Sequence, residues 1–184
     1  MLKLNSQELR EKIPADFELH NIKRHPIYII VDNVLDTYNI GSFFRLADAV
    51  SAERIYLCGS SETPPNHKIT KASVNTWQWV PWQYEKNINK IIKKLKAQGT
   101  QIVSIEQTPR SVDYRTAHYK FPIALVVGHE TNGISPGVLK KSDLAVELPM
   151  HGVNKSLNVV IALSIVSYKI LELASSTKMS PAAR

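Results

Sequence analysis

Five short, almost continuously apolar runs that alternate with helical patterns constrain the fold of this chain more than any other feature. The runs are rich in β-branched residues, which is typical of strands that are covered on both faces. They occupy residues 27–32, 54–58, 101–105, 122–127 and 144–148. Buried strands that alternate with helices predict an α/β fold with a mostly parallel sheet flanked by helices. In such a sheet, ligands bind beyond the carboxyl ends of the strands.

Two helical patterns accompany these runs. Residues 85–98 carry apolar side chains at helical spacing and end at Gly99, which predicts an amphipathic helix whose lysines form either a solvated face or an RNA-binding one. Residues 157–173 are apolar nearly all round, as in helices buried in a core or across a subunit interface. Because a chain of 184 residues can hardly wrap such a helix alone, we expect a homodimer. Residues 79–82 are expected to add an edge segment, since Pro81 is poorly tolerated in a central strand.

The length of the chain bounds its organisation. Because 184 residues suit a single domain, we expect one compact domain over residues 26–173. Residues 1–25 are polar and are expected to form an N-terminal appendage with a short helix at 6–12. Residues 174–184 are expected to be a frayed C-terminal tail.

Composition narrows the classes of function. The chain has 23 Lys and Arg against 16 Asp and Glu, and its net charge of +7 favours a polyanionic partner such as nucleic acid. The single cysteine, Cys58, excludes a disulfide framework or a multi-cysteine metal site. The six histidines show no metal-ligand spacing, so no metal is expected. No signal peptide and no apolar run of membrane-spanning length is evident, so we expect a cytoplasmic protein without a membrane partner.

Common nucleotide-binding motifs are missing. No G-x-G-x-x-G follows the first run, which disfavours dinucleotide binding and the usual Rossmann-type methyltransferase loop. Residues 128–135 have the glycine spacing of a phosphate-binding loop, but Ile134 stands where that loop needs a lysine. An NTPase is therefore disfavoured.

Three polar segments that the core does not need follow the predicted strands. The first contains N-I-G-S-F-F-R-L-A-D, which begins at Asn39 and carries Arg45 away from the buried stripe of a helix. This pattern fits a functional site, and it equally fits an Asn39 helix cap with a surface pair between Arg45 and Asp48. The alternatives stay open from the sequence alone.

Each of the other two segments, taken alone, also fits either a functional site or a purely structural feature. The second, G-H-E-T-N-G at residues 128–133, fits a ligand-binding loop or a plain glycine-rich turn. The third, L-P-M-H-G-V-N-K-S-L-N at residues 148–158, runs into the final apolar helix. Here Ser156 also fits a simple helix cap, with Asn158 as an accessory in the first turn.

Together and in this order, the three segments resemble the SpoU (TrmH-type) family of S-adenosylmethionine-dependent RNA 2′-O-ribose methyltransferases, within the SPOUT superfamily. The resemblance covers about residues 27–168. It implies an obligate homodimer and a C-terminal segment that threads a trefoil knot, a rare exception among folds. The matching positions are Asn39, Gly41 and Arg45 in the first motif, Gly128, Glu130 and Gly133 in the second, and Pro149, Met150, Gly152, Ser156, Leu157 and Asn158 in the third.

The resemblance also implies roles for these residues. Arg45 would stabilise the developing ribose alkoxide or bind an adjacent phosphate, with no metal ion. The other implied catalytic residues are Asn39, Glu130, Ser156 and Asn158. The implied contacts to S-adenosylmethionine are Gly128, Leu148, Leu157, Thr108, Gly133 and Met150, with Glu106 and Gln107 as weaker candidates beside Thr108. Candidate RNA contacts, each of which also fits an ordinary surface charge, are Lys68, Lys71, Arg110, Arg115 and Lys155.

The implied substrate is RNA rather than DNA, because only RNA carries the 2′-hydroxyl. We expect tRNA rather than rRNA, since small members without added domains can hold a compact RNA on the dimer surface, an argument by analogy of fold. The main alternative is a catalytically silent RNA-binding homodimer with the same fold. A nucleotide-binding protein of the NTPase type is a more distant one.

Overall fold

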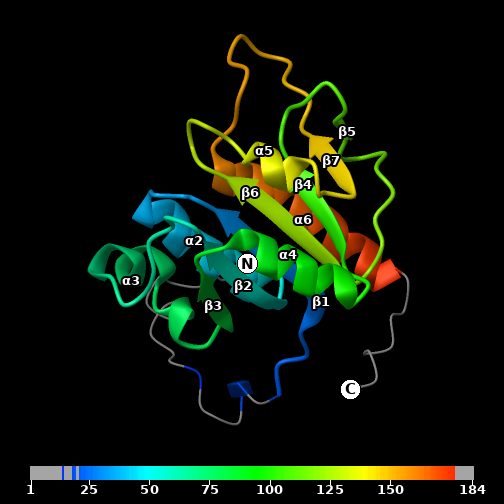
Figure 1. Ribbon diagram of the computed structural model, residues 1–184. Helices are drawn as coiled ribbons and strands as arrows, with labels where there is room; N and C mark the ends of the chain where they lie inside the picture. Colours follow the sequence, from blue (N-terminus) through cyan, green and yellow to red (C-terminus); the bar gives the residue numbers. More distant parts are fainter. Residues whose placement is uncertain (1–13, 15–17, 20, 177–184) are drawn as a thin grey trace, which may run out of the picture.

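The computed structural model describes residues 14, 18–19 and 21–176, so the helix expected at 6–12 lies outside the described residues. Its seven strands form one sheet in the order β3-β2-β1-β6-β4-β7-β5, and all neighbouring pairs are parallel (Figure 1). The strands are β1 (His25–Asp32), β2 (Ala52–Cys58), β3 (Trp82–Glu85), β4 (Gln101–Ile105), β5 (Val112–Asp113), β6 (Ile123–Gly128) and β7 (Leu144–Glu147). The helices are α2 (Thr37–Ala49), α3 (His67–Ser73), the 3₁₀ helix η1 (Thr76–Gln78), α4 (Ile88–Ala97), α5 (Pro136–Leu139) and α6 (Val159–Ser176).

All five predicted strands are present, and the parallel α/β fold is confirmed. The expected edge segment is displaced, because strand β3 begins only at Trp82, the last residue of that segment. Pro81 lies just before the strand, and its carbonyl oxygen accepts a hydrogen bond of 2.9 Å from the backbone N–H of Ile55. At this position the proline needs no N–H donor of its own.

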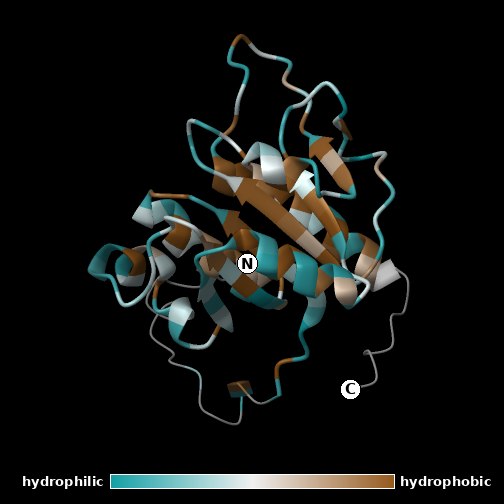
Figure 2. Cartoon of the chain, in the orientation of Figure 1, coloured by the Kyte–Doolittle hydropathy of each residue, from teal (hydrophilic) through white to brown (hydrophobic). Residues whose placement is uncertain are grey.

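Helices cover both faces of the sheet. Successive residues of β1 point to opposite faces, so Ile29 joins the core beneath α2, α3 and α6, whereas Ile30 joins the core beneath α4 and α5. Both isoleucines are fully buried. Figure 2 shows the result, apolar strands enclosed by helices such as α4 that turn a hydrophilic side outward.

The two long helices follow the sequence pattern with shifted ends. Helix α4 buries Ile91, Ile92 and Leu95 and begins after Asn87, whose side chain accepts a hydrogen bond from the N–H of Asn89. Its lysines remain on the exposed side, and Lys96 pairs with Asp143 at 2.5 Å.

Helix α6 is only partly covered. It buries Leu163, Val166 and Ile170 against the sheet, while Ile161 and Tyr168 are 49% and 54% exposed. None of the helices in the described part of the chain combines the length and the apolar character that a bilayer span requires. The trefoil knot and the cytoplasmic location stay predictions.

Candidate functional site

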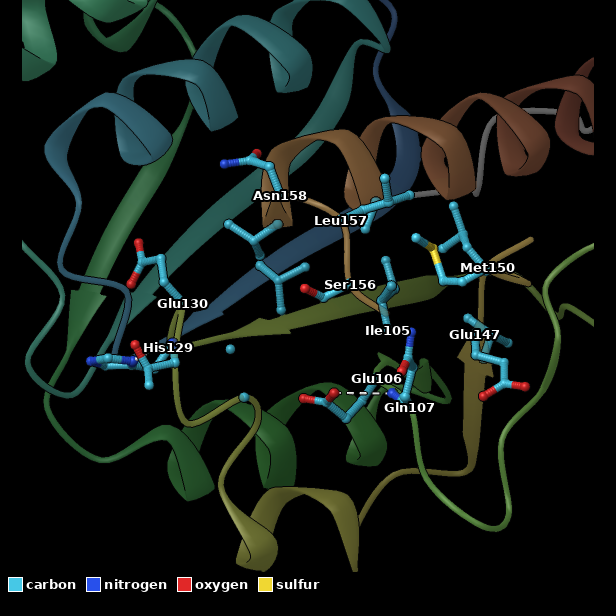
Figure 3. Close-up of a pocket in the computed structure, with 18 residues that line it drawn as sticks. Ile105, Glu106, Gln107, His129, Glu130, Glu147, Met150, Ser156, Leu157 and Asn158 are labelled. Carbon is cyan, nitrogen blue, oxygen red and sulfur yellow. Dashed lines mark hydrogen bonds between the residues drawn. The ribbon is translucent and has the colours of Figure 1, made fainter. Parts of the chain in front are cut away.

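A pocket of about 350 Å³ lies beyond the carboxyl ends of strands β4, β6 and β7, the edge where a parallel sheet is expected to bind ligands (Figure 3). Its volume falls within the range of about 300–1,000 Å³ that is usual for small-molecule sites. The segment before α6 covers it from the other side. The lining residues are Ile105, Glu106, Gln107, Val127, Gly128, His129, Glu130, Thr131, Gly133, Val146, Glu147, Leu148, Met150, Ser156, Leu157, Asn158, Val159 and Ala162.

A chain of side-chain hydrogen bonds joins the three polar segments at one end of this pocket. The Asn39 amide donates to Glu130 Oε1 over 2.9 Å, and the Asn158 amide donates to Asn39 Oδ1 over 3.1 Å. The backbone N–H groups of Leu35 and Asp36 also donate to the Glu130 carboxylate, over 3.4 and 3.2 Å. Segments far apart in the sequence are therefore held together by one network.

The Glu130 carboxyl is held in its ionised form. Burial works to raise its pKa, but the hydrogen bonds from Asn39 and from backbone N–H groups outweigh burial, so the pKa lies below its ordinary value. Both carboxylate oxygens accept hydrogen bonds from the segment around Asn39. Such a group is suited to fixing geometry rather than to carrying a proton.

The structure decides between the alternatives left open at the helix starts. Asn39 does not cap α2: the cap is Asp36, which accepts a bond of 2.7 Å from the N–H of Tyr38, while Asn39 is 7% exposed and faces Glu130. The surface pair of Arg45 with Asp48 is not among the ion pairs of the described residues, and Asp48 Oδ1 accepts a hydrogen bond of 2.7 Å from the indole N–H of Trp79.

At the start of α6, the cap is Asn158 rather than Ser156. The Asn158 side-chain oxygen accepts hydrogen bonds from the N–H groups of Val160 and Ile161, over 2.8 and 3.4 Å. Asn158 therefore caps α6 and binds Asn39 at the same time, so the position of this helix is linked to the site.

The glycine-rich segment makes a tight turn in the wall of the pocket. A Cβ on Gly128 would lie 2.2 Å from the carbonyl carbon of Gly133, which leaves room for glycine alone. Gly133 has a φ of +65°, and a Cβ there would lie 2.3 Å from Glu106 Oε2. That same oxygen accepts a bond of 2.9 Å from the N–H of Ile134. The hydrogen bond from Ile134 thus holds the Glu106 carboxylate against the turn.

The charges on the pocket lining are all of one sign. Three carboxylates, those of Glu106, Glu130 and Glu147, line the pocket, and the described part of the chain contributes no lysine or arginine to its lining. The Nδ1 of His129, which also lines the pocket, accepts hydrogen bonds from the N–H groups of Thr131 and Asn132. A low-dielectric pocket of this kind favours a ligand that carries positive charge.

The structure brings most of the predicted site residues together. The pocket is lined by Glu130, Ser156 and Asn158 of the implied catalytic set, and Asn39 reaches it through hydrogen bonds. Of the implied cofactor contacts, it is lined by Gly128, Gly133, Leu148, Met150 and Leu157, together with the weaker candidates Glu106 and Gln107. Their roles remain predictions.

Besides Asn39, two predicted catalytic or cofactor residues lie outside the lining, Thr108 and Arg45. Thr108 bonds instead to the hydroxyl of Ser111, over 2.9 Å, in the turn after β4. Arg45 is exposed on α2, and within residues 21–174 no hydrogen bond or ion pair engages its guanidinium. Conversely, the sequence reasoning did not single out Glu147, although its place at the carboxyl end of a predicted strand could have indicated it.

The candidate RNA contacts are spread over the surface. Lys68 and Lys71 lie on α3, whereas Arg110 and Lys155 are exposed in loops. Arg115 is bound to Asp113, and this bond lowers the pKa of the aspartate to about 2.

The described residues offer no other obvious catalytic centre. Among them, no group of three or more His, Cys, Asp or Glu side chains is placed to hold a metal ion. Cys58 is buried in the core, where desolvation raises its pKa to about 12, so its thiol is suited to packing rather than to nucleophilic attack.

Comparison with known proteins shows the family of the chain. The sequence profile of the SpoU rRNA Methylase family matches residues 26–168. The chain is 30% identical over 145 residues to the putative TrmH family tRNA/rRNA methyltransferase YacO of Bacillus subtilis, covering 79% of this chain but only 58% of the relative. It is also 30% identical over 166 residues to the tRNA (guanosine(18)-2′-O)-methyltransferase of Aquifex aeolicus, covering 88% of this chain and 76% of that one.

A solved structure shows the same fold. The crystal structure of an AdoMet-bound rRNA methyltransferase from Sinorhizobium meliloti superposes with a TM-score of 0.75 and 29% identity, covering 86% of this chain and 59% of that one. The profile match extends over most of the sequence, from the start of β1 to α6. The chain therefore belongs to the SpoU rRNA Methylase family.

Proposed function

We propose that this protein transfers the methyl group of S-adenosylmethionine to a ribose 2′-hydroxyl of structured RNA, tRNA rather than rRNA, through one domain over residues 26–173. The observation that carries the proposal is the hydrogen-bonded chain Glu130–Asn39–Asn158 at the edge of the acidic pocket. It unites the three segments on which the family resemblance rests. The Aquifex relative, named for 2′-O-methylation of a tRNA guanosine, supports the choice of atom and of RNA.

The lining of the pocket fits the cofactor. When bound, S-adenosylmethionine supplies an electrophilic methyl group on a positively charged sulfur. The carboxylates of Glu106, Glu130 and Glu147 complement that charge and oppose a phosphate-bearing nucleotide, which argues against an NTPase. The apolar part of the cofactor would lie against Leu148, Met150 and Leu157, which line the pocket beside these carboxylates. Gly128 and Gly133 would allow the cofactor to approach the backbone closely.

The hydroxyl that is to be methylated needs a positive neighbour. A ribose hydroxyl is a weak acid, and a cation either stabilises the developing alkoxide or holds a phosphate that accepts its proton. Because the described residues contribute no lysine or arginine to the pocket lining, this charge must come from outside it. The guanidinium of Arg45, exposed on the same helix that carries Asn39, is the group we assign to this task. Ser156 and Asn158 would complete the polar wall.

The same proposal includes a homodimer, with α6 at the subunit interface. Ile161 and Tyr168, seven positions apart and therefore on one side of this helix, form an apolar stripe and are 49% and 54% exposed. A second copy of the chain would cover that stripe and continue the core.

Methyl transfer to RNA tests the proposal directly. Purified protein is incubated with methyl-labelled S-adenosylmethionine and total RNA from a strain that lacks the gene, and the digested RNA is analysed by mass spectrometry. We expect one 2′-O-methylated nucleoside to become labelled, at a position in tRNA. Calorimetry with S-adenosylhomocysteine is run in parallel. No label in any RNA would overturn the proposed reaction. If S-adenosylhomocysteine does not bind either, the silent RNA-binding homodimer is favoured, since a scaffold need not bind the cofactor.

A further inference from the structure

A second hollow lies next to the proposed site and is not used by it. This hollow, of about 780 Å³, lies between the start of α2 and the start of α3. Its residues are Leu35, Asp36, Thr37, Tyr38, Glu62, Asn66, His67 and Lys68. The N–H groups of Leu35 and Asp36 donate to Glu130, so the hollow and the pocket meet at that carboxylate.

The hollow presents an exposed aromatic and an exposed aliphatic side chain. Tyr38 is 55% exposed and Leu35 is 48% exposed, although both belong to the segment that holds Glu130. Among the described residues nothing bonds to the Tyr38 hydroxyl, so the ring is fixed through its backbone alone. An exposed ring of this kind offers a stacking surface for an unpaired base.

The opposite wall carries groups that bind phosphate. Lys68 is exposed, and no described partner engages its ammonium group. Lys71 lies one helical turn further on α3, also exposed. The Asn66 side-chain oxygen is occupied by the N–H groups of Lys68 and Ile69, which leaves its amide N–H₂ free to donate. Lys68 and the Tyr38 ring both line the hollow and match the two halves of a nucleotide, whereas Lys71 lies outside the lining.

The acidic residues of the hollow are compatible with this ligand. Asp36 already accepts a hydrogen bond from the N–H of Tyr38, and Glu62 is exposed. Carboxylates can accept hydrogen bonds from the ring N–H or amino groups of a base, as they do in base recognition generally.

We infer that this hollow is a second nucleotide subsite, which holds the nucleotide next to the methylated ribose with its base on Tyr38 and its phosphate on Lys68. The inference rests on the proposed function for its choice of RNA. It assigns to this chain the capture of an unstacked nucleotide from a loop, rather than of a paired helix, because only an unpaired base can reach the ring.

Substitutions in the two walls test the subsite. Tyr38→Ala removes the stacking surface, Tyr38→Phe keeps it, and Lys68→Gln removes the cation. Lys140→Gln is the matched control, an exposed lysine on the other layer of the fold. The RNA dissociation constant, the KM for RNA and the affinity for S-adenosylhomocysteine are measured for each. We expect Tyr38→Ala and Lys68→Gln each to weaken RNA binding about tenfold, with Tyr38→Phe and the control near wild type and the cofactor affinity unchanged.

The outcomes separate the subsite from the reaction. Unchanged RNA binding in both Tyr38→Ala and Lys68→Gln would overturn the subsite, even if the wild-type protein methylates RNA. Dissociation of the homodimer by Tyr38→Ala, seen by light scattering, would overturn it too, because the ring would then be a subunit contact. If the wild type transfers no methyl group but its RNA binding still depends on Tyr38 and Lys68, the subsite stands and the proposed reaction fails.

Discussion

The side-chain amide of Asn158 donates to the side-chain oxygen of Asn39 over 3.1 Å, although 119 positions separate the two residues. The side-chain oxygen of Asn158 also accepts a hydrogen bond from the N–H of Val160 and so caps the start of α6. The side-chain amide of Asn39 donates in turn to the Glu130 carboxylate. The start of one helix is therefore coupled to the first turn of another and to the turn after β6. A substitution of Asn39, Glu130 or Asn158 should therefore change the geometry of the pocket.

Asn39→Ala should break this network at its centre. It removes the partner of the Asn158 amide and one of the hydrogen bonds to Glu130, whose carboxylate still accepts from the N–H groups of Leu35 and Asp36. One such hydrogen bond typically contributes about 0.5–1.5 kcal/mol to stability. We expect lower stability in urea unfolding and at least about a tenfold loss of methyl transfer. Ser42→Ala on the same helix is the control, since its hydroxyl bonds only to the carbonyl of Tyr38. Equal effects of the two substitutions would contradict a special role for Asn39.

Acid should weaken the contribution of Glu130 to stability. Because its pKa in the folded state lies below the ordinary value, its stabilisation is complete above the ordinary pKa and is lost as the pH falls through the lower, folded-state pKa. Urea unfolding of wild type and Glu130→Gln should therefore differ most at neutral pH and converge as the pH falls from the ordinary glutamate pKa, about 4.3, through the lower pKa of the folded state. A difference that is the same at pH 3 and pH 7 would show that the hydrogen bonds do not depend on the charge.

Gly133→Ala should damage the pocket. The substitution places a side chain in the left-handed region, at a cost of about 1–2 kcal/mol, and its Cβ would collide with the Glu106 carboxylate. Affinity for S-adenosylhomocysteine should fall together with thermal stability. Gly137→Ala is a close control, because a Cβ there meets nothing within 4 Å. If Gly133→Ala binds the ligand as tightly as Gly137→Ala does, the turn is not needed as we describe it.

Arg45→Ala should separate catalysis from folding. The side chain is exposed and, within residues 21–174, unpaired, so its removal should change the free energy of unfolding by no more than about 0.5 kcal/mol. Methyl transfer should be abolished while calorimetry still shows cofactor binding. Full activity in this variant would refute the catalytic role.

A charge on the exposed side of α6 should prevent dimerisation. Ile161→Glu puts a carboxylate into the apolar stripe, and a subunit interface does not tolerate an unpaired buried charge. We expect light scattering to give the mass of a monomer. Val153→Glu, on a side chain that is 96% exposed in the segment before α6, should leave the mass unchanged. A dimer in both variants would place the interface elsewhere.

The sequence predicted the sheet well because each central strand is a continuous β-branched run, and it predicted the pocket edge because strands of one direction end together. It could not predict β5, since two residues, Val112 and Asp113, are too short to show a period. The sequence left the helix caps undecided for a different reason. Asn39 looks like a cap in the sequence, but its partner Glu130 lies 91 positions away, and no local pattern reveals a contact of that range.

The acidic lining of the pocket stands inside a chain whose net charge is +7. The negative charge of the pocket and the net positive charge of the chain therefore act on different ligands. The pocket attracts a small cation, and the net charge of the chain attracts a polyanion such as RNA. Salt should accordingly slow the arrival of both ligands.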